Sequence, residues 1–236
     1  MLRLEESNDA TKFAPNVAKD TARGDGSTAE GGYIKLEDAS YNWGFRLTAQ
    51  KLQKGNHTKL NLQNQASEHD VLSGMSFELT PGEQLIVVGA VGAGKTSLLH
   101  AIMNETNHTG GEHTVRGRLA YVEQEPFIFS ATIRENVCFG LAYNERRFKT
   151  AIRVSQLYKD MENFVQAEET VIGERGINIS GGQKARISLA RAIYADADIY
   201  LLDDPLSAVD PEVANKIFRE CIEEHLSDKI VILATH

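Results

Sequence analysis

The sequence has few of the residues that stabilise secreted or membrane-spanning proteins. Its 236 residues include two cysteines, five prolines and one tryptophan. Cys138 and Cys221 lie far apart without the spacing of metal ligands, so we expect reduced thiols rather than a disulfide framework. Apolar runs such as Leu85–Val88 and Ile199–Leu202 have the length of buried strands and are too short to cross a bilayer. The first residues, Met1–Glu6, form no apolar signal core, so we expect no secretory signal.

The sequence also lacks an excess of positive charge. Its formal net charge is −8. A protein that binds nucleic acid through a basic face has the opposite balance, so we expect no nucleic-acid partner. The apolar fraction of 42% and the charged fraction of 25% are typical of a soluble globular domain with a sizeable core.

Composition divides the chain into a linker and a domain. Residues 5–32 contain almost no large apolar side chains and cannot bury enough surface to offset their ordering entropy. We therefore expect residues 1–32 to form a disordered linker and residues 33–236 to form the domain. Within the domain, residues 44–70 are dense in Gln, Asn and Lys, and we expect a polar insert without stable structure.

Strands and helices alternate along the rest of the domain. After a first strand near Tyr33, strands are expected at Val71–Thr80, Leu85–Val88, Arg118–Val122, Ile199–Leu202 and Lys229–Ala234. Helices are expected at Thr96–Asn104, Ala131–Val137, Glu145–Leu157, Lys159–Val165, Gly181–Ala195 and Asp210–His225. This alternation around a glycine-rich turn predicts a parallel sheet with helices on both faces.

The glycine-rich turn matches the phosphate-loop pattern GxxxxGK[ST] in full. Its residues and their neighbour are Gly89, Ala90, Val91, Gly92, Ala93, Gly94, Lys95, Thr96 and Ser97. Glycines let the backbone N–H groups approach phosphate oxygens, and the start of the following helix adds its positive dipole. Lys95 supplies a cation for the β- and γ-phosphates, and the Thr96 hydroxyl is a ligand for Mg²⁺. A simple glycine-rich turn is the alternative, but the flanking strand and helix favour binding of Mg-ATP.

An apolar strand downstream ends in a carboxylate. Ile199–Asp203 consists of four apolar residues followed by the acid. In a parallel sheet, such a strand brings its terminal acid beside the phosphate loop. Asp203 is therefore expected to hold Mg²⁺ together with Thr96.

A second anion-binding helix start follows the phosphate loop along the chain. It consists of Ile179, Ser180, Gly181, Gly182 and Gln183, which we call the signature segment. Ser180 is a favourable N-cap, and the glycines expose backbone N–H groups. A chain with one phosphate loop needs no second phosphate site for its own nucleotide. The signature segment is therefore expected to contact the nucleotide of another domain in a head-to-tail pair.

These segments, in this order, resemble the nucleotide-binding domain of ABC transporters from about Tyr33 to the end of the chain. The resemblance makes Trp43 the aromatic residue that stacks on adenine, with Tyr41 as the alternative. It makes Gln124 the glutamine that senses Mg²⁺ and the membrane domain, and His236 the histidine that contacts the γ-phosphate. Ser207–Asp210 matches the segment known as the D-loop.

The resemblance implies an α/β fold of the P-loop NTPase, ABC-type ATPase class. The expected parts are a mixed or parallel core sheet, an antiparallel β subdomain and an α-helical subdomain at about residues 131–190 that contains the signature segment. Further strands and helices of the family are expected beyond His236, so that the chain is C-terminally truncated relative to the complete domain.

The residues in and around these motifs are most similar to those of subfamily C, which includes the multidrug-resistance-associated exporters and the cystic fibrosis conductance regulator. Ser180–Ala192 and Asp203–Asp210 show this similarity, and the first nucleotide-binding domain is the nearer match. Gly173–Gly176 also resembles an exporter segment that touches the coupling helices. The resemblance implies a second nucleotide-binding domain in the same polypeptide, transmembrane domains, and a location on the cytoplasmic side of a membrane. Leu2–Glu6 resembles the end of the transmembrane segment that leads into this domain, so residues 1–32 are expected to be the linker from the transmembrane domain.

One position departs from the pattern of a hydrolysing ABC domain. The residue after Asp203 in that pattern is a glutamate that polarises the attacking water, and here it is Asp204. Aspartate is shorter by one C–C bond, roughly 1.5 Å. A misplacement of about 1 Å costs on the order of 100-fold in rate. With Asp204, His236 and Gln124 as the catalytic set, we therefore expect slow hydrolysis at this site and faster turnover at a partner site.

Three functions remain open at this level. The first is a transport ATPase module, and the second is a regulatory module that binds ATP to gate a channel. Asp204 and the polar insert favour the regulatory module, whereas the complete set of motifs favours the transporter. The third is a soluble ABC protein that acts on ribosomes or in DNA repair. The negative net charge of the chain and the similarity of its motifs to subfamily C disfavour it.

Overall fold

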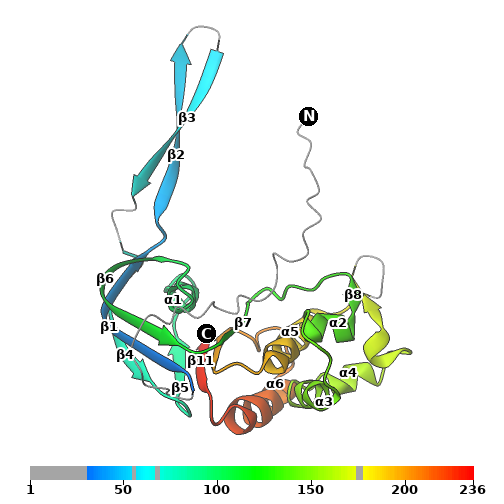
Figure 1. Cartoon of the computed structure of the whole chain (residues 1–236). Helices are drawn as coiled ribbons and strands as arrows, with labels where there is room; N and C mark the ends of the chain where they lie inside the picture. Colours follow the sequence, from blue (N-terminus) through cyan, green and yellow to red (C-terminus); the bar gives the residue numbers. More distant parts are fainter. Residues whose placement is uncertain (1–30, 55–56, 67–69, 174–177) are drawn as a thin grey trace.

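The computed structural model describes residues 31–54, 57–66, 70–173 and 178–236. Figure 1 shows an antiparallel sheet on one side, a parallel sheet in the middle and a group of helices on the other side. The antiparallel sheet has the order β4-β1-β6, and the parallel sheet has the order β5-β11-β10-β7. The antiparallel strands are β1 (Tyr33–Asn42), β4 (Leu72–Leu79) and β6 (Asn107–Arg116). The parallel strands are β5 (Gln84–Val88), β7 (Leu119–Val122), β10 (Ile199–Asp203) and β11 (Ile230–Thr235).

The central strands of the parallel sheet are buried on both faces. β10 pairs with β11 on one side and with β7 on the other. Tyr200 and Leu202 of β10 enter the core shared with the helical part, whereas Ile199 and Leu201 enter the core shared with the antiparallel sheet. Successive residues of a strand point to opposite faces, so a strand covered on both faces needs an unbroken apolar run.

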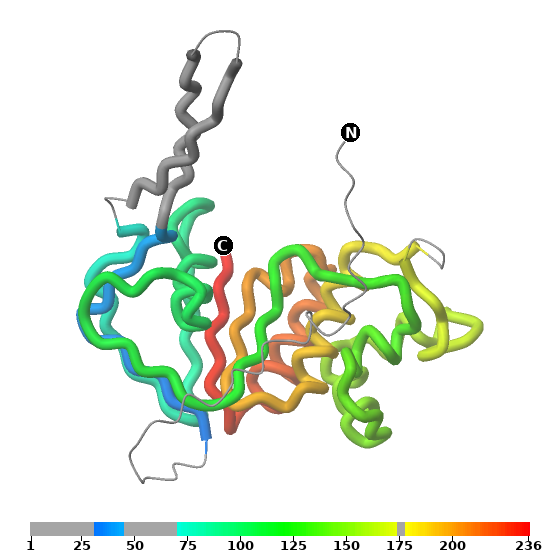
Figure 2. Tube along the Cα trace, turned by 45° about the horizontal axis from the view of Figure 1, so that its top comes forward, coloured from blue at the N-terminus to red at the C-terminus, as the bar shows by residue number. Residues whose placement is uncertain are grey.

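Helix α1 (Lys95–Ile102) packs in the core between the two sheets. Its Leu98, Leu99 and Ile102 are buried with Ile34 and Leu36 of β1. Figure 2 shows β11, in red, passing through the middle of the molecule between β5 and β10. β5 is followed in the chain by α1, and its neighbours in the sheet run parallel to it. The start of α1 therefore lies near the carboxyl ends of the parallel strands.

The helical part lies between β7 and β10 in the sequence. It contains α2 (Ile133–Cys138), α3 (Glu145–Val154), α4 (Tyr158–Met161), the 3-10 turn η2 (Ala167–Glu169) and α5 (Gly181–Ala195). Two short strands, β8 (Ala131–Thr132) and β9 (Val171–Ile172), pair antiparallel. Thr132 and Ser180 begin α2 and α5 with capping boxes, in which the side chain at the third helical position closes back onto the cap backbone.

Several helix boundaries differ from the expectation. Residues 131–132 pair with β9 instead of starting the helix, and the segment expected at Lys159–Val165 is helical only as α4. The single helix expected at Asp210–His225 is α6 (Pro211–Ile217) followed by a π-helical stretch, η3 (Phe218–His225). Periodicity does not distinguish a wider helical turn from an α-helix over so short a range.

Strand β6 was not expected from the sequence. Its residues include Gly110 and Gly111 and few apolar side chains, but it pairs along almost the whole of β1, from Tyr33 opposite Arg116 to Asn42 opposite Asn107. Strand pairing uses backbone groups, which every residue other than proline supplies in full. The partner strand therefore determines β6 more strongly than its own composition.

The prediction that the polar insert lacks stable structure is wrong for most of its length. Within residues 44–70, β2 (Phe45–Lys54) and β3 (His57–Ala66) form an antiparallel two-stranded sheet. Backbone pairing does not require apolar composition, so a count of apolar residues misses it. Residues 1–30 of the expected linker lie outside the described residues, as does most of the Gly173–Gly176 segment.

Both cysteines are free and buried. Burial raises the pKa of the Cys221 thiol to about 12. Within the described ranges, no helix combines the length and the hydrophobicity that crossing a bilayer requires.

Candidate active site

The phosphate loop connects β5 to α1. Gly94 caps α1 with a φ of 92°, a left-handed conformation that favours glycine. Lys95, the first residue of the helix, donates from Nζ to the carbonyl oxygens of Gly89 at 2.6 Å and Ala90 at 3.1 Å. Its Nζ is also 3.2 Å from Nδ1 of His236, which follows β11. The loop thus holds one cation against its own backbone and against the end of a neighbouring parallel strand.

Thr96 and Asp203 form a direct contact between the phosphate loop and β10. The Thr96 hydroxyl donates to Oδ2 of Asp203 at 2.7 Å, and the carboxylate is buried. Tyr121 of β7 donates its phenol proton to the same oxygen at 3.4 Å. Burial and, next, the charge of Asp203 raise the pKa of Tyr121, which keeps the phenol protonated as a donor.

Asp204 lies directly after β10 with a φ of 46°, and its side chain is almost fully buried. Its Oδ1 accepts a hydrogen bond of 3.4 Å from the Thr235 hydroxyl, and its Oδ2 is 3.5 Å from Nε2 of His236. His236 therefore lies between Lys95 on one side of its ring and Asp204 on the other. Lys95 belongs to the phosphate loop, and Asp204 follows the carboxyl end of β10, so both neighbours lie at the expected phosphate end of the site.

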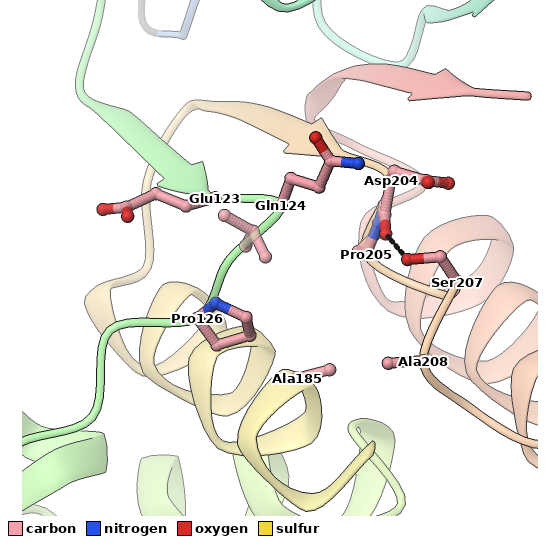
Figure 3. Close-up of a pocket in the computed structure, with 9 residues that line it drawn as sticks. Glu123, Gln124, Pro126, Ala185, Asp204, Pro205, Ser207 and Ala208 are labelled. Carbon is pink, nitrogen blue, oxygen red and sulfur yellow. Dashed lines mark hydrogen bonds between the residues drawn. The ribbon is translucent and has the colours of Figure 1, made fainter. Parts of the chain in front are cut away.

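Gln124 lies just after β7 and borders two pockets. One pocket reaches Thr96 and Asp203, and the other reaches Asp204 and the D-loop residues Ser207 and Ala208. Figure 3 shows the Gln124 amide turned toward Asp204, whereas Glu123 points away from it. Gln124 thus lies between the expected metal ligands and the expected catalytic carboxylate.

The two aromatic candidates for adenine differ in exposure. The Trp43 ring, just after β1, is 53% exposed, whereas Tyr41 is fully buried in the core shared with α1. Burial raises the pKa of Tyr41 to about 12. A ring without exposed surface cannot stack on a ligand, so the alternative assignment to Tyr41 is wrong.

The signature segment starts α5 and is fixed from within. The Ser180 hydroxyl accepts from the Gln183 backbone at 3.2 Å, and the Gln183 side-chain oxygen accepts from the Ser180 backbone at 2.8 Å. Asp160, on α4, accepts from Nε2 of Gln183 at 3.1 Å and from two guanidinium nitrogens of Arg186, each at 2.8 Å. Among the described residues, no hydrogen bond or ion pair joins the signature segment to the phosphate loop of the same chain.

Gly182 packs tightly against the D-loop. A Cβ atom added at Gly182 would lie 2.8 Å from the backbone oxygen of Ala208. At Gly181 the nearest atom would be the Ala208 Cβ at 3.7 Å, an ordinary contact. The start of α5 thus needs glycine at only one of these two positions for steric reasons.

We expect Gly182→Ala to reduce the free energy of unfolding by about 1–3 kcal/mol, because backbone must shift to accept the methyl group. Gly181→Ala is the matched control, and it should be neutral or slightly stabilising because alanine favours helix. Urea unfolding followed by circular dichroism measures both. Equal stability of the two variants would contradict the close approach to Ala208.

Comparison with known proteins assigns this arrangement to a family. The family model described as "ABC transporter" matches residues 72–207, which extend from β4 through the phosphate loop and the signature segment to the D-loop. The chain belongs to the ABC transporter family. It is thus an ATP-binding domain with the P-loop NTPase fold, as the order of motifs predicted.

Similar proteins include members of ABC transporter subfamily C. The chain is 53% identical over 173 residues to human ATP-binding cassette sub-family C member 4, which is 73% of this chain and 13% of that protein. It is 45% identical over 165 residues to the probable multidrug resistance-associated protein lethal(2)03659 of Drosophila melanogaster, 70% of this chain and 12% of that protein. ABC transporter C family member 13 of Oryza sativa subsp. japonica is 38% identical over 236 residues, 100% of this chain and 14% of that protein.

Three residues of this ABC domain's site were not found from the sequence. Tyr121 lies on a strand that was predicted, but only its hydrogen bond to Asp203 reveals its place in the site. His100 and Asp160 lie on helices, and they enter the site through contacts with residues distant in sequence. No motif marks either of them, so pairing in three dimensions is the only signal.

Proposed function

We propose that this domain binds Mg-ATP and pairs head-to-tail with a second ABC nucleotide-binding domain of the same polypeptide to drive ATP-dependent export. The observation that carries the proposal is the 2.7 Å contact between the Thr96 hydroxyl and Asp203 beside Lys95. It joins the phosphate loop to the carboxylate at the end of β10, as a site for a nucleotide and its metal requires.

In this proposal, each end of ATP has its own residues. Lys95 binds the β- and γ-phosphate oxygens, and the backbone N–H groups from Gly89 to Ser97 surround them with the dipole of α1 behind. Trp43 stacks on the adenine, because its ring is exposed where β1 ends. Val91 projects from the loop and is 88% exposed, so a partner domain has access to it.

The donor set around Thr96 suits Mg²⁺. A hydroxyl and a carboxylate supply hard oxygen atoms, and Gln124 borders the same pocket. Mg²⁺ binds proteins through one or two carboxylates and takes further ligands from substrate phosphates. When bound, Mg²⁺ would neutralise the charge that develops on the phosphate oxygens. Thr96 and Asp203 would hold it, with Gln124 nearby.

Hydrolysis at this domain's own phosphate loop is proposed to be slow. Asp204 is the residue that would orient the attacking water, but its carboxylate already contacts Thr235 and His236. Its side chain is also shorter than the glutamate of the hydrolysing pattern. His236, close to both Lys95 and Asp204, would contact the γ-phosphate.

The signature segment is proposed to act on the partner domain's ATP. Its capping box and the contacts with Asp160 fix the backbone N–H groups at the start of α5 for an anion from another molecule. Gln124 is proposed to transmit the state of the site to transmembrane domains. The domain itself is proposed to lie on the cytoplasmic side of the membrane. The acidic charge gives no support to a nucleic-acid partner.

A regulatory module that binds ATP to gate a channel is the second candidate. The observation that favours it is Asp204, because gating by occupancy does not require hydrolysis in this domain. The similarity to the probable multidrug resistance-associated protein lethal(2)03659 of Drosophila melanogaster favours the transporter.

We expect Mg-ATP to quench the fluorescence of Trp43, the only tryptophan in the sequence, because adenine stacks on its ring. Trp43→Ala should weaken ATP binding by about 1–3 kcal/mol, measured by equilibrium dialysis. Tyr41→Phe is the control, because the buried Tyr41 ring has no surface for a ligand. Bound ATP without quenching, together with unchanged affinity in Trp43→Ala, would remove Trp43 from the site.

A further inference from the structure

The Trp43 ring is exposed, but one neighbouring ring packs against it. The His100 ring lies edge-on to it, with the ring centroids 5.4 Å apart and an angle of 62° between the planes. Edge-to-face pairs at this separation are attractive and have a preferred geometry. An exposed indole would otherwise have several rotamers available, so this contact favours one orientation of the Trp43 ring.

His100 is itself held from two further sides. Its Nδ1 is 2.6 Å from Oε2 of Glu105, and the Glu105 backbone N–H donates to the His100 carbonyl at 2.9 Å. The Tyr121 ring lies 5.7 Å from the His100 ring at 66°. Asn104, with a φ of 61°, makes the turn after α1 that returns Glu105 to His100. The imidazole therefore cannot rotate without losing the contact with Glu105.

Helix α1 connects this histidine to the phosphate end of the site. Thr96 and His100 are four residues apart in α1, so they lie on the same face, with a rise of about 6 Å between them. Both border the pocket that also contains Tyr121 and Asp203. A row of contacts thus runs from Trp43 through His100 and Tyr121 to Asp203.

We propose that His100 is a positioning residue for the base of the nucleotide: it holds the Trp43 ring in its stacking orientation. The proposal rests on the adenine site of the proposed function. Helix α1 then positions both ends of ATP. It begins with Lys95 and Thr96 at the phosphates, and His100 in its last turn orients the ring that stacks on the base. The spacing between the base platform and the phosphate site is set by the length of α1.

The test compares ligands with and without a base. We expect His100→Ala to weaken binding of Mg-ATP roughly two- to tenfold, the value of one edge-on aromatic contact. Binding of Mg-tripolyphosphate, which has no base, should not change. His100→Phe keeps an aromatic edge and should restore most of the affinity for ATP. Calorimetric titration of the full chain measures each affinity.

Trp43 provides a second readout that a merely structural role would not change. In His100→Ala, the fluorescence anisotropy of Trp43 should fall and its quenching by acrylamide should rise, because the indole moves more freely. His108→Ala is the matched control: it removes a histidine ring 5.4 Å from the Tyr41 ring, the same separation, but from a buried partner. It should leave the difference in affinity between ATP and tripolyphosphate intact.

Each result supports or overturns the proposal. An equal loss of affinity for both ligands in His100→Ala would show that His100 acts on the phosphate end through Tyr121 and would overturn it. If wild type binds ATP more tightly than tripolyphosphate and His100→Ala keeps that preference, His100 has no such role while the adenine site stands. If wild type shows no preference for ATP, both the adenine site and the role of His100 are wrong.

Discussion

Replacement of Lys95 by alanine is expected to weaken Mg-ATP binding by about 30-fold or more, since removing one partner of a buried charge pair costs about 2–5 kcal/mol. The Lys95 ammonium is already fixed by the carbonyl oxygens of Gly89 and Ala90 and lies beside His236. A cation held in this way does not have to be ordered when phosphate arrives. In Lys95→Ala, the β- and γ-phosphate oxygens lose the lysine cation and retain the backbone N–H groups, the helix dipole and the proposed contacts with Mg²⁺ and His236.

Isothermal titration with Mg-ATP measures this loss, and circular dichroism checks the fold. Lys216→Ala is a matched control, because Lys216 is a lysine of helix α6 whose exposed ion pair with Glu212 contributes little to stability. It should bind ATP as wild type does. Unchanged affinity in Lys95→Ala would remove the phosphate-loop assignment, whatever the other motifs suggest.

The second large effect is expected when the domain is paired with the proposed second nucleotide-binding domain. Ser180→Arg should abolish ATP turnover, because arginine places bulk and charge at the helix start proposed to face the partner's γ-phosphate. It also removes the N-cap, which costs about 0.5–2 kcal/mol in helix stability. Asp204→Asn should reduce turnover only modestly, because most hydrolysis is proposed to occur at the partner's phosphate loop.

Steady-state ATPase assays of the two variants, each in the proposed assembly with a second nucleotide-binding domain, distinguish hydrolysis at this domain's phosphate loop from hydrolysis at the partner's. The isolated chain should hydrolyse ATP slowly or not at all, because no partner signature segment covers its γ-phosphate site. Thermal unfolding of each variant controls for loss of fold. If Asp204→Asn stops turnover as completely as Ser180→Arg, Asp204 is a working base and the proposal of a slow site is wrong.

Local chemistry made part of the structure predictable. Strand β10 was read from its apolar run, because a strand buried on both faces needs such a run. The bounds of α5 followed from Ser180 as N-cap and from helical periodicity, and the structure has the predicted helix at Gly181–Ala195. The contact between Thr96 and Asp203 followed from the rule that parallel strands present their carboxyl ends at one edge.

Tertiary pairing determined what the sequence did not reveal. Strand β6 depends on β1, and the β2–β3 pair depends on backbone contacts that polar residues make as readily as apolar ones. The difference between Tyr41 and Trp43 is one of burial, and two aromatic residues so close in sequence look alike without a fold. Asp160 has no motif, and only its contacts with Gln183 and Arg186 reveal it.

The strand order has a consequence for synthesis on the ribosome. β5, which leads into the phosphate loop, pairs within its sheet with β11, and β11 ends at Thr235. The phosphate loop is therefore synthesised before the strand that holds β5 in the sheet. More than a hundred further residues must be added before β11 is complete. Among the described residues, β11 is the strand that pairs with β5 in this sheet, and such non-local pairing forms slowly. A nascent chain without β11 is therefore expected to leave β5 unpaired and to gain little stability from ATP, because the phosphate loop is not yet anchored.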